Sequence, residues 1–238
     1  MQLTIMGFFD NVKFINRLAY LVGGLAIAIL GFSVVNYAIN NWFVVENVVI
    51  TGNIEHIDLK TLTLVAKEKI RDNLFTLDLD DIQNNFQNIP WVKHVTVMRD
   101  FPHSLLIGVD EYSAIARWGN EGLIASDGNI FNGNDVSGEL PIFYVAPQNV
   151  SEAISDFNMV NAMLAKHNVH LTELNLYGFG ITKFVLSNQL NITICGSAVE
   201  SQIALLNKYW DKLYELNPGL NYVNMCYKNA MAINQATK

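Results

Sequence analysis

The longest apolar stretch lies near the start of the chain. No charged residue occurs from Leu18 to Val45, a run of 28 residues whose most apolar part is Leu18–Ile39. About 20 apolar residues are enough for a helix to cross the roughly 30 Å hydrocarbon layer of a bilayer. A cleaved signal peptide has a shorter apolar region and a small-x-small cleavage site, which Asn36–Asn41 does not provide. The pattern predicts a retained transmembrane helix over 18–40.

The flanks of this segment predict its orientation. Lys13 and Arg17 precede the segment, and the next Lys or Arg is Lys60. The positive-inside rule then places residues 1–17 as a cytoplasmic tail and everything past about residue 40 outside, as in a single-pass type II membrane protein. Trp42 and Phe43 fit the aromatic belt expected at the far membrane interface.

Beyond the helix, two patterns follow one another. The pattern of 43–112 predicts the element order β-α-α-β-β. The pattern of 113–234 predicts mostly strands with two amphipathic helices. Residues 235–238 are then expected to form a C-terminal tail. The expected fold class is mixed α+β. In the first region, strands are expected over 44–50, 91–99 and 104–112, with helices capped by Asp58 and by Asp78 or Asp80. In the second, strands are expected over 115–118, 123–125, 129–131, 171–177, 181–187, 190–195 and 220–233, with one helix capped by Ser151 and another over 199–216.

Composition narrows the function classes. The chain has 238 residues, 51% of them hydrophobic and 16% charged, and a net charge of −7, which argues against nucleic acid as a partner. Cys195 and Cys226 are too few for a disulfide scaffold or a four-thiolate zinc site. Whether they bond to each other in an oxidising compartment depends on geometry, which sequence does not give.

Catalytic patterns are nearly absent. There is no G-x-S-x-G, H-E-x-x-H or P-loop motif. His167 and His170 could approach a metal, but a structural role is favoured since no acidic or thiol ligand lies near them in sequence. The strongest enzyme alternative is a membrane-anchored transpeptidase of the sortase kind with Cys195 as nucleophile, which lacks the arginine expected after the cysteine. We expect no catalytic residue, no cofactor, no metal and no small-molecule substrate.

A set of short motifs at matching spacings carries a family resemblance. They are Pro90-Trp91-Val92, Val97-x-Arg99-x-Phe101-Pro102, Leu105, Glu111, Ala116-x-Trp118, Asp127-Gly128 with Phe131, Leu140-Pro141, and Tyr222–Tyr227. Together with the short tail and the single membrane helix, they resemble the bacterial FtsQ/DivIB family over essentially the whole chain. The resemblance implies that 43–112 is a POTRA domain and 113–234 the family's β domain.

The resemblance also implies a function and a partner site. It implies a non-enzymatic divisome scaffold that binds FtsB and FtsL outside the inner membrane, at the septum, and regulates cell-wall synthesis there. An edge strand near the C-terminus would pair with the partner's strand. We expect this edge over 222–233, with partner-binding residues Tyr222, Tyr227, Asn229, Met231 and Ile233. The alternative is a POTRA-bearing component of polypeptide export, although only one POTRA pattern is present.

Several residues depart from the family pattern. Phe101 stands at the place of a usual Trp, Asn224 and Cys226 replace a usual Asp and Arg, and Ala230 replaces a usual Gly. Trp91 and Trp118 are expected to pack in the interior, since a large aromatic side chain buries much apolar area. Arg99 and Pro102 are expected to shape the turn between the second and third strands of the POTRA module.

Overall fold

A computed structural model describes residues 12–70, 73–133, 138–196, 199–227 and 230–235. The chain divides into two compact units. The first contains the chain up to Gly52, Asp58–Phe86 and Val95–Val109, and the second contains Asn53–Ile57, Gln87–His94 and the chain from Asp110 onward. The architecture is mixed α+β, as the pattern predicted.

The N-terminal helix α1 spans Val12–Trp42. It is longer than the predicted 18–40, because helical geometry continues through the polar flanks on both sides. Its segment Val12–Ile39 is long and apolar enough to cross a membrane, and none of its most apolar stretch is buried in the protein. Exposed apolar side chains over such a length are typical of a helix that contacts lipid. The helix therefore supports single-pass membrane anchoring.

A three-stranded sheet with two helices follows in the order β-α-α-β-β. Its elements are β1 Asn47–Thr51, α2 Leu59–Lys69, α3 Leu79–Gln87, β2 Val92–Asp100 and β3 Ser104–Glu111. The strand order is β1-β3-β2, with β1 parallel to β3. Asp58 caps α2 through the Lys60 amide, and Asp78 accepts hydrogen bonds from the first amides of α3, so both predicted caps are confirmed. Fully buried Leu62, Ile82 and Phe86 line the inner faces of the helices.

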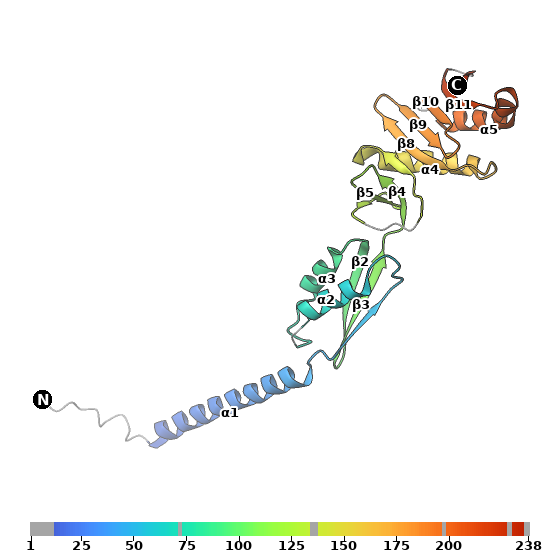
Figure 1. The fold of residues 1–238 in the computed structure, drawn as a ribbon. Helices are drawn as coiled ribbons and strands as arrows, with labels where there is room; N and C mark the ends of the chain where they lie inside the picture. The colour runs from blue at the N-terminus through green and yellow to red at the C-terminus, as the bar shows by residue number, and fades with distance from the viewer. Residues whose placement is uncertain (1–11, 71–72, 134–137, 197–198, 228–229, 236–238) are drawn as a thin grey trace. The chain divides into compact units, whose positions relative to one another are not determined.

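The larger sheet has nine strands in the order β12-β11-β10-β9-β8-β7-β4-β5-β6 (Figure 1). Parallel pairings join β10 with β11, β4 with β7, and β7 with β8. The strands are β4 Ala114–Trp118, β5 Gly122–Ala125, β6 Ile130–Phe131, β7 Ile142–Tyr144, β8 Leu171–Tyr177, β9 Ile181–Leu186, β10 Asn191–Cys195, β11 Leu220–Tyr227 and β12 Ala230–Gln235.

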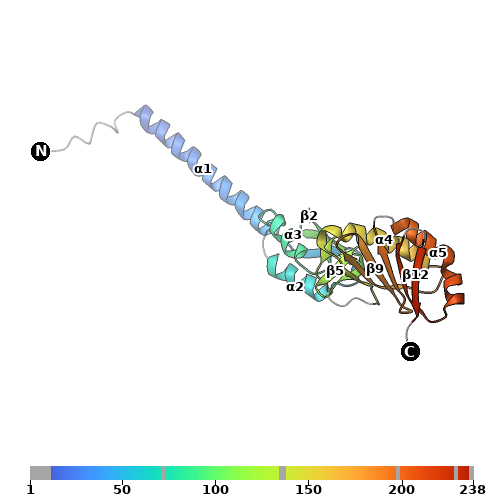
Figure 2. The ribbon, with the colours of Figure 1, turned by 90° about the horizontal axis from the view of Figure 1, so that it is seen from above.

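Two helices cover one face of this sheet (Figure 2). They are α4 Val150–Leu164, which follows a 3₁₀ turn at Pro147–Asn149, and α5 Val199–Leu216. Five apolar residues at spacings of three and four form the inner face of α5, and all five are buried: Val199, Ile203, Leu206, Trp210 and Leu213. Buried side chains of both helices and of the sheet form one continuous core.

Three predicted details of this region are wrong. The expected single strand over 220–233 is a hairpin of β11 and β12, so only its second half lies at the sheet edge. Ser151 does not cap α4, because that helix begins one residue earlier, directly after the 3₁₀ turn. Strand β7 was not predicted, since three residues are too few to show a period.

Candidate protein-docking edge

The C-terminal hairpin ends the larger sheet. Strand β12 is its outermost strand and pairs with β11 in antiparallel fashion. Ala232, Ile233 and Asn234 of β12 are exposed. An edge strand presents a row of backbone N–H and C=O groups that can pair with a strand of another chain. This edge is the feature of the second unit best suited to bind a protein.

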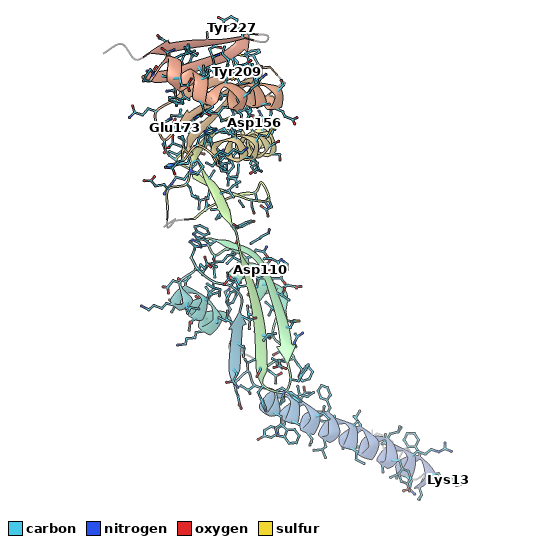
Figure 3. The ribbon with its side chains drawn as sticks, turned by 90° about the vertical axis from the view of Figure 1, so that its right-hand side faces the viewer. Lys13, Asp110, Asp156, Glu173, Tyr209 and Tyr227 are labelled. Carbon is cyan, nitrogen blue, oxygen red and sulfur yellow. A yellow bond between two sulfur atoms is a disulfide. The ribbon has the colours of Figure 1, made fainter. Side chains whose placement is uncertain are left out.

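Four of the five residues predicted to bind a partner lie on the two strands of this hairpin. Met231 and Ile233 lie on β12, and the half-buried Met231 also packs against the core. Tyr222 and Tyr227 lie on β11, one strand in from the edge. Tyr227 ends that strand with 58% of its surface exposed, and Figure 3 shows it at the rim of the sheet. Asn229 lies outside the described residues.

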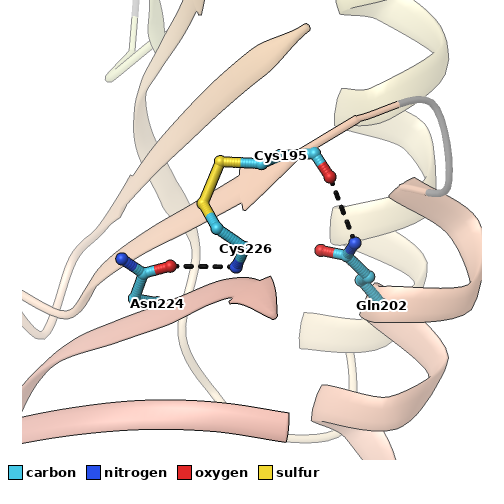
Figure 4. The surroundings of a disulfide bond; sticks show 4 residues. All are labelled: Cys195, Gln202, Asn224 and Cys226. Carbon is cyan, nitrogen blue, oxygen red and sulfur yellow. Dashed lines mark hydrogen bonds between the residues drawn. A yellow bond between two sulfur atoms is a disulfide. The ribbon is translucent and has the colours of Figure 1, made fainter. Parts of the chain in front are cut away.

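A disulfide ties this hairpin to the rest of the sheet (Figure 4). Cys195 ends β10 and Cys226 lies near the end of β11, and their Cα atoms are 4.6 Å apart across the parallel pair. Gln202 of α5 donates a hydrogen bond to the Cys195 carbonyl at 3.2 Å, and the Cys226 amide donates to Asn224 Oδ1 at 2.9 Å. The sequence alone does not determine whether these two cysteines bond to each other. Because Cys195 is bonded, it is not the free thiolate that a transpeptidase requires, and that enzyme alternative is withdrawn.

The hairpin is almost free of charge. From Leu220 to Gln235 the sequence has one charged residue, Lys228, which lies outside the described residues. The two positions at which the family usually carries Asp and Arg, Asn224 and Cys226, make internal contacts here instead. The described part of this edge therefore presents main-chain, apolar and amide groups rather than charges.

Trp91 lies in an aromatic cluster. Its side chain is 4% exposed, stacks on the His56 ring at 4.0 Å and meets Phe131 edge-on at 5.2 Å. A Cβ atom at position 133 would lie 2.8 Å from the indole of Trp91, so the close packing at this point favours glycine. Pro90 and the buried Val92 flank it, and Trp91 itself has a positive φ of 73°. The predicted interior role of Trp91 fits this packing.

The Glu111 side chain holds the loop 55–57 through the backbone amides of that loop. Its carboxylate accepts hydrogen bonds from the amides of Glu55, His56 and Ile57 at 2.9–3.3 Å, and His56 Nδ1 lies 3.3 Å away. Burial by itself would raise the pKa of Glu111, but the backbone donors and His56 outweigh it and hold that pKa below its usual value. The side chain therefore acts as a structural anion.

Arg99, predicted to shape the turn between β2 and β3, has contacts outside that turn. Its Nε donates to the Leu74 carbonyl at 2.5 Å and its Nη2 to the Leu77 carbonyl at 2.8 Å. Arg99 thus holds the segment between α2 and α3, and its part in the turn stays a prediction. Pro102 does belong to that turn, through a cis Phe101–Pro102 peptide bond.

Trp118 and the histidines have structural contacts. Trp118 Nε1 donates to the Val145 carbonyl at 2.8 Å while its ring packs against the core. His167 stacks on Trp210 at 4.8 Å, which supports a structural role for that imidazole. Among the described residues, no group of three or more His, Cys, Asp or Glu side chains is placed to hold a metal ion.

Comparisons with known proteins match both regions. The family model "POTRA domain, FtsQ-type" matches residues 43–112, and the model "Cell division protein FtsQ/DivIB, C-terminal" matches residues 116–225. The chain is 26% identical to the cell division protein FtsQ of Neisseria gonorrhoeae over 229 residues, which is 95% of each chain. It is 26% identical to the Burkholderia pseudomallei protein of the same name over 235 residues, 95% of this chain and 94% of that one.

Proposed function

Because the chain belongs to the FtsQ/DivIB family of cell division proteins, we propose that it is a membrane-anchored scaffold of the divisome that docks a partner strand on β12. In this proposal the partners are FtsB and FtsL, and the complex promotes septal cell-wall synthesis. Residues 18–40 form the anchor, 43–112 the POTRA domain and 113–234 the β domain.

The observation that carries this proposal is the character of the exposed sheet edges. Strand β6, at the opposite end of the larger sheet, has two residues, which is too short to align a partner. Strand β2, an edge of the smaller sheet, carries Lys93, Arg99 and Asp100, and charges on an edge discourage strand pairing. Strand β1, the other edge of the smaller sheet, has five residues and no charge. Strand β12 has six residues and no charge, so it is the longest uncharged edge of the two sheets and the one we propose for strand addition.

The disulfide supports the proposed orientation. Disulfides persist in oxidising compartments such as the bacterial periplasm and are rare in the cytosol. The bond between Cys195 and Cys226 therefore favours a periplasmic second unit, in agreement with Lys13 and Arg17 on the cytoplasmic side of α1. We propose that the protein lies in the inner membrane at the division septum with its N-terminus in the cytoplasm.

The recognition mode would combine main-chain pairing with a few side chains. Strand addition takes its affinity from backbone hydrogen bonds and its specificity from alternate side chains. Tyr227 is the side chain most accessible to a partner at the rim, and tyrosine is a frequent interface anchor. Ile233 offers an apolar contact on β12 itself, with 36% of its surface exposed.

The test measures binding of purified FtsB–FtsL from the source organism to the full chain in nanodiscs. Tyr227→Ala is expected to weaken binding by about 30-fold, the loss of about 2 kcal/mol that defines a hot spot. The matched control is Tyr177→Ala, because Tyr177 is exposed to a similar degree, 53%, on the inner strand β8. It is expected to leave the affinity unchanged.

A proline scan across residues 231–234 tests whether backbone hydrogen bonds of β12 contribute to partner binding. In an antiparallel pair, alternate residues direct their N–H groups toward the partner strand and away from it. Prolines at the outward positions should abolish partner binding with little loss of stability, whereas prolines at the inward positions disturb the β11 pairing. Normal FtsB–FtsL binding by every proline variant and by Tyr227→Ala would reject β12 as the docking edge.

A further inference from the structure

Three phenylalanines from distant parts of the first unit contact one another. The Phe43 ring centroid lies 4.8 Å from that of Phe75 and 6.2 Å from that of Phe101, and the last two are 5.3 Å apart. This aromatic cluster is not a core, because Phe75 is 50% exposed and Phe101 52% exposed. The chain neighbours of Phe43 are exposed apolar residues as well, Trp42 at 70% and Val44 at 44%. Such contiguous apolar surface marks a site of contact with another phase or molecule.

The cluster is fastened to the end of the membrane helix. Phe43 directly follows Trp42, the last residue of α1, and its carbonyl accepts a hydrogen bond from the Leu74 amide at 2.8 Å. The side-chain amide of Asn73 donates to the carbonyl of Ile39 within α1. Arg99 holds the same segment through the carbonyls of Leu74 and Leu77. The Phe75 ring is thus held close to the carboxyl end of α1.

Helix geometry gives the depth of this end in a bilayer. The apolar part Leu18–Ile39 has 22 residues and is roughly 33 Å long at about 1.5 Å per residue, which matches the roughly 30 Å hydrocarbon layer. Trp42 lies three residues further, roughly 4.5 Å along the axis. The headgroup layer adds about 5–7 Å on each side, so Phe43 lies within it.

We propose that the aromatic cluster of Phe43, Phe75 and Phe101 inserts into the headgroup layer and seats the first unit on the bilayer surface. The occupant of the patch is lipid, because the patch is continuous with a helix that already crosses the membrane. Aromatic side chains at this depth are favoured, since their rings partition into the interface. The proposal rests on α1 spanning the bilayer and does not depend on the docking edge or on the direction of insertion.

The test uses spin labels on the full chain, reconstituted in vesicles of phosphatidylethanolamine and phosphatidylglycerol. Labels are attached to Phe75→Cys or Phe101→Cys, because both native cysteines are closed in a disulfide. Collision with a water-soluble nickel chelate is compared with collision with oxygen, which concentrates in lipid. The control label is at Leu64→Cys on α2, whose native side chain is 67% exposed.

The labels at 75 and 101 are expected to be several-fold less accessible to the nickel chelate than the label at 64, and more accessible to oxygen. Adding Phe101→Ser to the chain labelled at position 75 should raise the nickel accessibility of that label toward the accessibility measured at position 64. Equal nickel accessibility at all three positions in vesicles would overturn the proposal. Protection that occurs only in native membranes would also overturn it, because a protein and not lipid would then cover the cluster.

Discussion

Replacing one buried carboxyl should make the second unit more stable in a pH-dependent way. Asp156, marked in Figure 3, lies on α4 and is 4% exposed. Its Oδ2 has the Thr182 hydroxyl 3.5 Å away, and Glu152 lies one helical turn before it. Burial, and then the charge of Glu152, raise the pKa of Asp156 from 3.8 to about 6, although the Thr182 hydrogen bond opposes them.

The sign follows from proton linkage. Between about pH 4 and about pH 6, the folded protein keeps the proton on Asp156 whereas the unfolded chain has lost it. The free energy of unfolding therefore falls as pH rises through this range. At 1.36 kcal/mol per pKa unit, the ionised carboxylate costs the folded protein about 3 kcal/mol above this range. Asp156→Asn removes that cost and keeps a group that can bond to Thr182. It should stabilise the unit by about 2–3 kcal/mol at about pH 8 and by close to nothing at about pH 4.

The assay is chemical denaturation of the full chain in mild detergent, followed by tryptophan fluorescence because Trp210 lies in the same core. Glu152→Gln should give a smaller gain over the same pH range, since it removes only the second cause. Asp211→Asn, on an exposed position of α5, is the matched control and should show no such pH-dependent gain. An Asp156→Asn protein no more stable than the wild type at about pH 8, or equally stabilised at about pH 4, would refute the reasoning.

Three further changes test other parts of the structure. Reducing the disulfide, or replacing both cysteines with serine, should lower the free energy of unfolding by about 3–4 kcal/mol, because the bond closes a loop with a sequence separation of 31; denaturant midpoints with and without reductant measure this. Gly52→Ala should destabilise the first unit by about 1–3 kcal/mol, seen as a lower melting temperature, because Gly52 has a φ of 145° and its Cβ would lie 2.0 Å from the Val109 carbonyl oxygen. Glu111→Ala should free the loop from Asn53 to Ile57, with faster amide exchange there, and the wild-type loop should show the same change as pH falls below the ordinary range of a glutamate. Unchanged denaturant midpoints would contradict the stabilising role of the disulfide. An unchanged melting temperature would contradict the role of Gly52, and unchanged amide exchange would contradict the role of Glu111.

Periodic segments of this sequence could be predicted well, and isolated contacts could not. Helix α5 and strand β8 have the predicted bounds because their apolar residues repeat over many positions. The last strand was predicted as one piece because Lys228 and Asn229 lack the glycine that usually announces a hairpin turn, and Ala230 follows them.

Roles that depend on tertiary contacts had no sequence signal. The bonds from Arg99 to the carbonyls of Leu74 and Leu77 join residues more than 20 positions apart, which no local pattern reports. Asp156 looks like an ordinary polar residue of an amphipathic helix, yet α4 buries it against the sheet. The aromatic cluster likewise joins Phe43, Phe75 and Phe101 only through the fold of the first unit. The sequence predicted an edge strand at the C-terminus, and β12 is that edge, but the sequence did not show that a hairpin forms it. Docking of a partner on this edge stays a prediction.

Hydrogen–deuterium exchange on the full chain in nanodiscs, with and without FtsB–FtsL, tests the central proposal most directly. Strand addition gives new partners to the outward N–H groups of β12, so exchange across Ala230–Gln235 should slow strongly when the partner binds. Tyr227→Ala should reduce this protection at the same partner concentration. Saturated binding of FtsB–FtsL with unchanged exchange on β12 and protection elsewhere would contradict the account.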